Sequence, residues 1–135
     1  FMIALDSSVL IDTLIADPCF AQASEACIEQ ALAKGEVVVC EAVVAEVQAM
    51  LDTKANLMEV LEQLGIRYEP TSQTAAMRAG HMYQRFGSRK EKRERVMAEF
   101  LIGAHALLQC SALITRDSGF YRDYFKGLKI IDPTH

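Results

Sequence analysis

Short apolar runs alternate with longer segments of helical periodicity along the 135-residue chain. The apolar runs predict strands at about 3–5, 37–40, 66–69, 112–115 and 128–131. Between them, apolar residues recur at helical spacing over about 9–14, 18–34, 41–51, 57–64, 73–86, 99–108 and 120–125. Strands that alternate with helices are typical of an α/β fold with a mainly parallel sheet. We therefore expect one three-layer α/β/α domain over residues 2–135, with about five strands.

Composition and charge exclude several classes of protein. Hydrophobic residues make up 51% of the chain and charged residues 24%, which excludes wholesale disorder. The net charge is −4 and the pI about 5.4, so nucleic-acid binding would need a local basic patch. No segment approaches the roughly 20 apolar residues of a membrane span, and we expect a cytoplasmic protein.

Four cysteines occur at positions 19, 27, 40 and 110, and none forms a C-x-x-C pair. Most of them lie inside segments that are predicted to be apolar helix or strand. This spacing favours buried free thiols in a reducing compartment over disulfides or a zinc site.

Acidic side chains occur where the predicted strands end. Asp6 follows the first strand and Asp117 follows the strand at 112–115. The carboxyl ends of parallel strands share one rim of the sheet, where ligands of α/β proteins bind. Glu46 and Glu99 lie near the starts of two predicted helices that could reach the same rim. We expect the four acids to converge there.

A cluster of four carboxylates is unfavourable without a counter-charge, since two like charges about 4 Å apart repel by roughly 4 kcal/mol at a dielectric of 20. A divalent cation reverses this, and oxygen ligands suit Mg²⁺ or Mn²⁺. Such a site supports phosphodiester hydrolysis. Each acid also has an ordinary structural role open to it, because Asp6 and Asp117 could cap helices, Glu99 could interact with a helix dipole and Glu46 could reach solvent.

Four segments together resemble a known family. They are 3–12 (IALDSSVLID), 43–47 (VVAEV), 100–106 (FLIGAHA) and 113–120 (LITRDSGF). In order and spacing they are similar to the PIN-domain ribonucleases, and within these to the VapC-like toxins of toxin–antitoxin systems. The resemblance implies a PIN-like α/β/α fold, metal-dependent cleavage of RNA, a homodimer, and a small antitoxin that covers the acidic rim.

The family's acidic site carries over onto Asp6, Glu46, Glu99 and Asp117 as catalytic residues and ligands of Mg²⁺ or Mn²⁺. Ser8 and Thr115 match hydroxyl positions that support such sites. Glu99 departs from the family, which usually has aspartate there, so a longer side chain must reach the same ion.

Basic residues are concentrated just before Glu99. Arg89, Lys90, Lys92, Arg93 and Arg95, together with Arg116 further on, are candidates for RNA binding. The tract over 88–95 has two open interpretations, a solvated surface or a clamp for RNA phosphates. His105 follows Glu99 by six residues, about 240° around a helix, so we expect it to pack away from the acidic site.

Two other functions remain as alternatives. A catalytically weakened PIN-like module that binds RNA or protein would explain the departure at Glu99. A haloacid-dehalogenase-like phosphatase would use Asp6 as nucleophile, but such enzymes carry a second aspartate two residues on, where this chain has Ser8.

Overall fold

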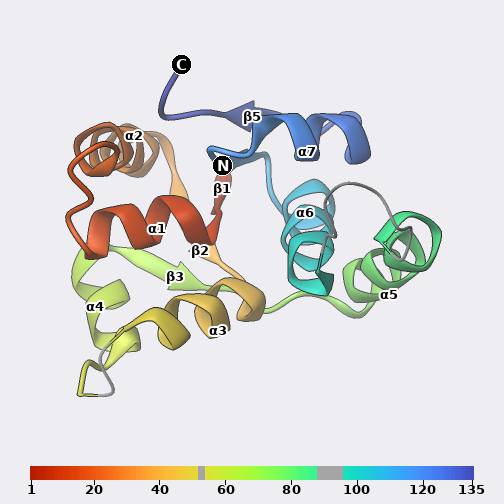
Figure 1. Cartoon of the computed structure of the whole chain (residues 1–135), viewed down its shortest axis with the longest axis horizontal. Coiled ribbons are helices and arrows are strands. Elements are labelled where there is room, and N and C mark those ends of the chain that lie inside the picture. Colours follow the sequence, from red (N-terminus) through yellow and green to blue (C-terminus); the bar gives the residue numbers. More distant parts are fainter. Residues whose placement is uncertain (52–53, 88–95) are drawn as a thin grey trace.

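A parallel sheet of five strands forms the centre of the computed structural model, which describes residues 1–51, 54–87 and 96–135 (Figure 1). The strand order is β3-β2-β1-β4-β5, and all four pairings are parallel. The strands are β1 (Met2–Leu5), β2 (Glu36–Val39), β3 (Ile66–Tyr68), β4 (Ala112–Ile114) and β5 (Ile130–Ile131). The predicted α/β class and the expected number of strands are confirmed.

Helices connect every pair of consecutive strands. They are α1 (Ser7–Leu14), α2 (Ala21–Lys34), α3 (Glu41–Met50), α4 (Leu57–Leu64), α5 (Gln73–Met82), the π-helical turn η1 (Tyr83–Gly87), α6 (Met97–Gln109) and α7 (Ser118–Tyr124). The path from β1 through β2 to β3 runs toward one edge, and the path through β4 to β5 returns past β1. Right-handed crossovers then place the two sets of helices on opposite faces of the sheet. The three-layer arrangement is as expected.

The second helix begins later than the sequence pattern predicted. Its first residue is Ala21, not a residue near Pro18. The Asp17 carboxylate accepts hydrogen bonds from the backbone N–H groups of Cys19 (2.8 Å) and Phe20 (3.0 Å). The Ala21 N–H also donates a hydrogen bond of 2.9 Å to the Asp17 carbonyl, so Asp17 and Pro18 form a capping turn that leads into α2. The break predicted at residues 52–53 lies outside the described residues.

Aromatic side chains form the packing between α6 and α7. Phe100, Phe120 and Phe125 are each at most 5% exposed, and their rings contact one another. Gly103 on α6 makes this packing possible, because a Cβ atom there would lie 2.3 Å from the Phe125 ring. The close contact holds α6 and α7 together, and both helices begin at the rim above β1 and β4.

The four cysteines are free thiols, as predicted, but they are less buried than expected. Cys40 is buried, Cys27 and Cys110 are partly exposed, and Cys19 is exposed. Within the described ranges, the structure contains no helix with the length and apolar character needed to cross a membrane.

Candidate active site

The chain leaves β1 and β4 in opposite directions, which makes the crevice between these strands the topological switch point of the sheet. Ligands of open α/β sheets bind at such a point. Leu5 pairs with Ile114 in register, and the Asp6 N–H donates a hydrogen bond of 3.0 Å to the Ile114 carbonyl. Asp6 and Asp117 therefore leave adjacent strands at the same rim, as the sequence predicted.

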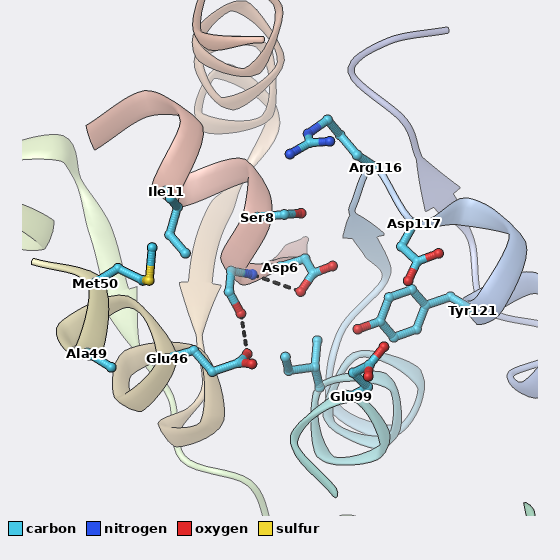
Figure 2. Close-up of a pocket in the computed structure, with 12 residues that line it drawn as sticks. Asp6, Ser8, Ile11, Glu46, Ala49, Met50, Glu99, Arg116, Asp117 and Tyr121 are labelled. Carbon is cyan, nitrogen blue, oxygen red and sulfur yellow. Dashed lines mark hydrogen bonds between the residues drawn. The ribbon is translucent and has the colours of Figure 1, made fainter. Parts of the chain in front are cut away.

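A pocket of about 680 Å³ opens at this rim. Figure 2 shows the carboxylates of Asp6, Glu46, Glu99 and Asp117 pointing into a common space. They come from the end of β1, from α3, from the first turn of α6 and from the end of β4. The structure thus brings together all four acids proposed from the sequence, while their catalytic role stays a prediction.

Asp6 is the most buried of the four acids, with 7% of its surface exposed. It caps α1, since its Oδ1 accepts a hydrogen bond of 2.8 Å from the Ser7 N–H. Burial, with a smaller contribution from the charges of Glu46 and Asp117, raises the Asp6 pKa to about 6, although hydrogen bonds from Thr115 and Ser7 lower it. A buried carboxylate close to two others favours either a proton or a bound cation.

Thr115 connects the two strand-end acids. Its hydroxyl donates a hydrogen bond of 2.6 Å to Asp6 Oδ2 and accepts one of 3.0 Å from the Asp117 N–H. Thr115 is fully buried, so water does not compete for these bonds. It is therefore placed to orient the Asp6 carboxylate, which is the kind of supporting contact that the sequence analysis expected.

Two adjacent serines of α1 lie at the pocket, and only Ser8 was named from the sequence. Ser7 Oγ donates a hydrogen bond of 2.5 Å to Glu46 Oε1, a supporting contact that was not predicted. Successive residues of a helix point about 100° apart, so adjacent serines in the first turn of α1 cannot make the same contact. Ser8 also lines the pocket, and its buried Oγ has no hydrogen-bond partner among the described residues.

Glu99 serves the helix in which it lies and also faces the pocket. As the third residue of α6, it accepts a hydrogen bond of 3.3 Å from the Val96 N–H. Its half-buried side chain lines the pocket with the other acids. Glu99 thus does interact with the start of its helix, as one interpretation held, and its carboxylate still faces the pocket.

Tyr121 was not anticipated from the sequence. Its ring lies between Asp117 and Glu99, and its hydroxyl points into the space that the acids share (Figure 2). Burial and the charges of Asp6, Glu99, Asp117 and Glu46 raise the Tyr121 pKa well above its usual value. The phenol therefore stays protonated and can donate a hydrogen bond in the pocket. The position of Tyr121 one helical turn after Asp117 was the available signal.

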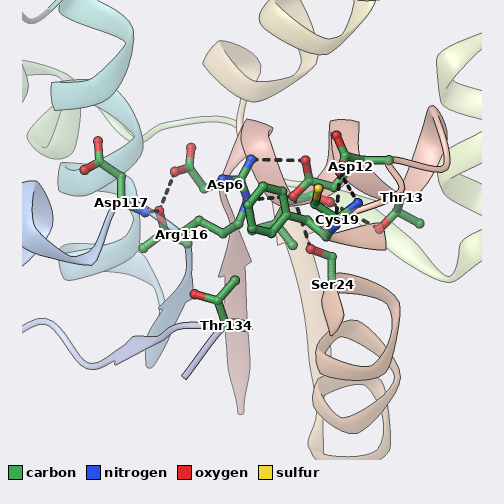
Figure 3. Close-up of polar contacts among 12 residues, drawn as sticks. Asp6, Asp12, Thr13, Cys19, Ser24, Arg116, Asp117 and Thr134 are labelled. Atoms are coloured by element: carbon green, nitrogen blue, oxygen red, sulfur yellow. Dashed lines mark hydrogen bonds and ion pairs between the residues drawn. The ribbon is translucent and has the colours of Figure 1, made fainter. Parts of the chain in front are cut away.

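Arg116 lies at the edge of the pocket and is held by Asp12 (Figure 3). Its Nε and Nη2 atoms lie 2.7 and 3.1 Å from the two Asp12 carboxylate oxygens, and its guanidinium lies 4.0 Å from the centroid of the Phe20 ring. The proposed contact with RNA stays a prediction. The other basic candidates, at 89, 90, 92, 93 and 95, lie outside the described residues.

The donor set of the pocket fits a hard divalent cation. Four carboxylates offer oxygen atoms only, which suits Mg²⁺ or Mn²⁺ and disfavours soft metals. The Ser8 hydroxyl, unpartnered in the described part of the chain, is one more oxygen for the ion or for a water molecule beside it. The Asp6 pKa is raised chiefly by burial, and a bound cation would favour the charged carboxylate in that environment.

The parallel sheet, the switch-point pocket and the four acids define an α/β protein of the PIN type. The PIN domain family matches residues 3–126, and the chain belongs to this family. No curated protein sequence matches it.

Several solved structures have the same fold at low sequence identity. A VapBC2 complex from Rickettsia felis, bound to a promoter DNA fragment, has a TM-score of 0.68 at 15% identity and 98% coverage of both chains. FitAcB from Neisseria gonorrhoeae has a TM-score of 0.67 at 24% identity and 99% coverage of both. A toxin–antitoxin complex from Klebsiella pneumoniae has 0.65 at 19% and 97% of both. These likenesses extend over nearly the whole chain and show the PIN-like fold.

Proposed function

We propose that this chain is a Mg²⁺- or Mn²⁺-dependent endoribonuclease and the toxin of a toxin–antitoxin pair. The observation that carries the proposal is the convergence of four carboxylates at the switch point, one of them buried with a pKa raised to about 6. A cation would offset both the mutual repulsion of the acids and the cost of burying Asp6. Membership of the PIN family supports the same chemistry.

Asp6, Glu46, Glu99 and Asp117 would hold the cation. When bound, a divalent cation supplies Lewis-acid activation of the scissile phosphate and neutralises developing negative charge. The chain's own hydroxyl groups fix the carboxylates: those of Ser7 and Thr115 donate to two of the acids. Rigid positioning of this kind is what supporting contacts contribute to metal sites.

Positive charge beside the acids would hold the RNA backbone. Among the described lining residues of the pocket, Arg116 is the cation, and its ion pair with Asp12 fixes its place. An arginine that keeps part of its donor set free can bind a phosphate oxygen. The guanidinium side chain remains 27% exposed, which leaves room for that contact.

An antitoxin is the partner that this proposal requires. The similar structures include complexes named as VapBC2 and as toxin–antitoxin complexes. An acidic pocket is complementary to a cationic side chain from such a partner. Exposed apolar residues at the pocket mouth and on the first turn of α6, Met50 (63% exposed) and Met97 (39%), offer it additional surface. Homodimerisation is proposed on the family resemblance alone.

The direct test is cleavage of an end-labelled single-stranded RNA by the purified chain in Mn²⁺ or Mg²⁺. We expect Asp117→Asn to reduce the cleavage rate by more than about 100-fold, because the loss of a ligand exceeds the 10–100-fold cost of losing a supporting contact. Asp123→Asn is the matched control, since Asp123 is an exposed acid on the same helix. Equal rates for the wild type and Asp117→Asn, or full activity in excess chelator, would refute the proposal.

The partner is tested separately. The protein encoded by the adjacent reading frame should co-purify with the chain and block RNA cleavage when added in equimolar amount. Cleavage that continues unchanged in its presence would argue against the toxin role while leaving the nuclease intact.

A further inference from the structure

A second group of metal-ligating side chains lies outside the acidic pocket. One ligand atom each from Glu69, His105 and Cys110 lie within 4.8 Å of one another. Glu69 follows β3, His105 lies in α6, and Cys110 is the C-cap of α6. The group thus combines a carboxylate oxygen, an imidazole nitrogen and a thiol sulfur.

The segment after β3 is attached firmly to the end of α6. The Gln109 side-chain amide accepts a hydrogen bond of 2.8 Å from the Ser72 N–H and donates one of 3.1 Å to the Pro70 carbonyl. These contacts hold Glu69 next to α6 although the two segments are far apart in the sequence. These contacts between α6 and the segment after β3 therefore keep the three candidate ligands close together.

The helix separates this group from the acidic pocket. Cys110 follows Glu99 by eleven residues on α6, a distance of about 16 Å along the helix axis at 1.5 Å per residue. His105 follows Glu99 by six residues, a rotation of about 240°, so the two side chains point about 120° apart around the helix. None of the three residues lines the acidic pocket. A ligand bound here would not share donors with the nuclease site.

His105 provides an independent sign that a ligand is missing. The residue is 1% exposed, and its Nε2 atom has no hydrogen-bond partner in the described ranges. Burial lowers the His105 pKa, so the ring is neutral, although the nearby Glu69 and Glu41 oppose the change. Neutral imidazole with a nitrogen that has no hydrogen-bond partner is the form of histidine that binds metals.

The geometry points to a zinc site formed by Glu69, His105 and Cys110. Mixed nitrogen, sulfur and oxygen donors suit Zn²⁺ and exclude Mg²⁺ as the preferred ion. Three protein ligands leave the fourth tetrahedral position to water. On binding, the Cys110 sulfur bonds to zinc and its proton passes to solvent.

Small side-chain movements would complete the site. Ligand atoms around a tetrahedral zinc lie about 3.5 Å apart, so the side chains must approach by about 1 Å. Glu69 and Cys110 are only partly buried and have room to rotate. The ion pair of Glu69 with Arg67, at 3.3 Å, uses Oε1 and leaves the second carboxylate oxygen for the metal. Zinc would join the end of β3 to the end of α6.

Cobalt(II) titration of the chelator-treated full chain tests this inference, because a cobalt–thiolate bond gives a near-ultraviolet charge-transfer band. We expect one equivalent to produce the band in the wild type and in Cys27→Ser, a matched control for a partly buried thiol. Asp117→Asn, which disrupts only the proposed nuclease site, should keep the band. Cys110→Ser should lose it and should bind zinc more than about tenfold more weakly. A band that persists in Cys110→Ser would overturn the inference.

Glu69→Gln keeps the test decisive if the cysteine variant does not fold. Glutamine has the same size, and Glu69 is partly exposed, so the fold should be retained. Its zinc affinity, measured by competition with a coloured chelator, should fall by more than about tenfold while its circular dichroism stays unchanged. Wild-type affinity in Glu69→Gln would contradict the zinc site. This result is independent of whether the chain cleaves RNA.

Discussion

Replacing Asp6 by asparagine should stabilise the metal-free protein at alkaline pH, although Asp6 is a proposed ligand. The Asp6 pKa is raised from its ordinary value of 3.8 to about 6, chiefly by burial. In the unfolded chain the carboxyl group loses its proton near the ordinary value. Between these two pKa values the folded state holds more protons than the unfolded state, so the free energy of unfolding falls as pH rises.

The size of this effect follows from the pKa difference. A difference of about 2 pKa units, at 1.36 kcal/mol each, costs the folded state about 3 kcal/mol once the pH exceeds 6. Asparagine removes that cost and keeps an oxygen to accept from the Ser7 N–H. The NH₂ group of asparagine takes the place of the carboxylate oxygen that accepts a hydrogen bond from Thr115 Oγ1. Losing this hydrogen bond costs about 1 kcal/mol. The net gain at about pH 8 is about 2 kcal/mol, and it disappears near pH 4.

Urea unfolding followed by circular dichroism measures this difference, since the chain has no tryptophan for fluorescence. The wild type, Asp6→Asn and the exposed control Asp123→Asn are compared in chelator at about pH 4 and about pH 8. The stability of Asp6→Asn relative to the wild type should rise by about 2 kcal/mol between the two pH values. A pH-independent difference, or destabilisation at alkaline pH, would refute the electrostatic reasoning.

Two further predictions concern the packing around the site. Arg116→Gln should lower the free energy of unfolding by about 3 kcal/mol, because it leaves Asp12, 3% exposed, without its ion pair. Urea unfolding should show that adding Asp12→Asn recovers part of the loss, and strictly additive losses would contradict this coupling. Gly103→Ala should destabilise by about 1–3 kcal/mol, because its Cβ would lie 2.3 Å from the Phe125 ring. Gly80→Ala, with no atom within 4 Å, should stabilise its helix by up to about 1 kcal/mol in thermal unfolding, and equal effects of the two substitutions would count against the packing argument.

The layout of the fold was predictable because local signals agree with the tertiary structure. Each β-branched or apolar run became a strand, largely buried in β1, β2 and β4 and more exposed in β3 and β5, and each periodic segment became a helix. The start of α2 was placed less well, because the residues after Asp17 form a capping turn before the regular helix begins. The strand order could not be predicted from the hydrophobic pattern, because it depends on pairing between segments such as β1 and β4 that are distant in the sequence.

The candidate site was predictable to the extent that it follows from strand ends. Asp6 and Asp117 could be placed on one rim because parallel strands end there together. The contact of Ser7 with Glu46 could not be predicted, because it depends on the helical phase of α1, which the sequence does not define to within one residue. The group of Glu69, His105 and Cys110 could not be foreseen, because it depends on how the segment after β3 contacts the end of α6.

The central claim is that the four carboxylates act together as one site for a divalent cation. Mn²⁺ binding to the chelator-treated chain, followed by electron paramagnetic resonance of the free ion, measures this directly. We expect Asp117→Asn to bind Mn²⁺ more than about tenfold more weakly than the wild type, and Asp123→Asn to bind it equally well. Equal Mn²⁺ affinity in the wild type and Asp117→Asn would contradict the claim.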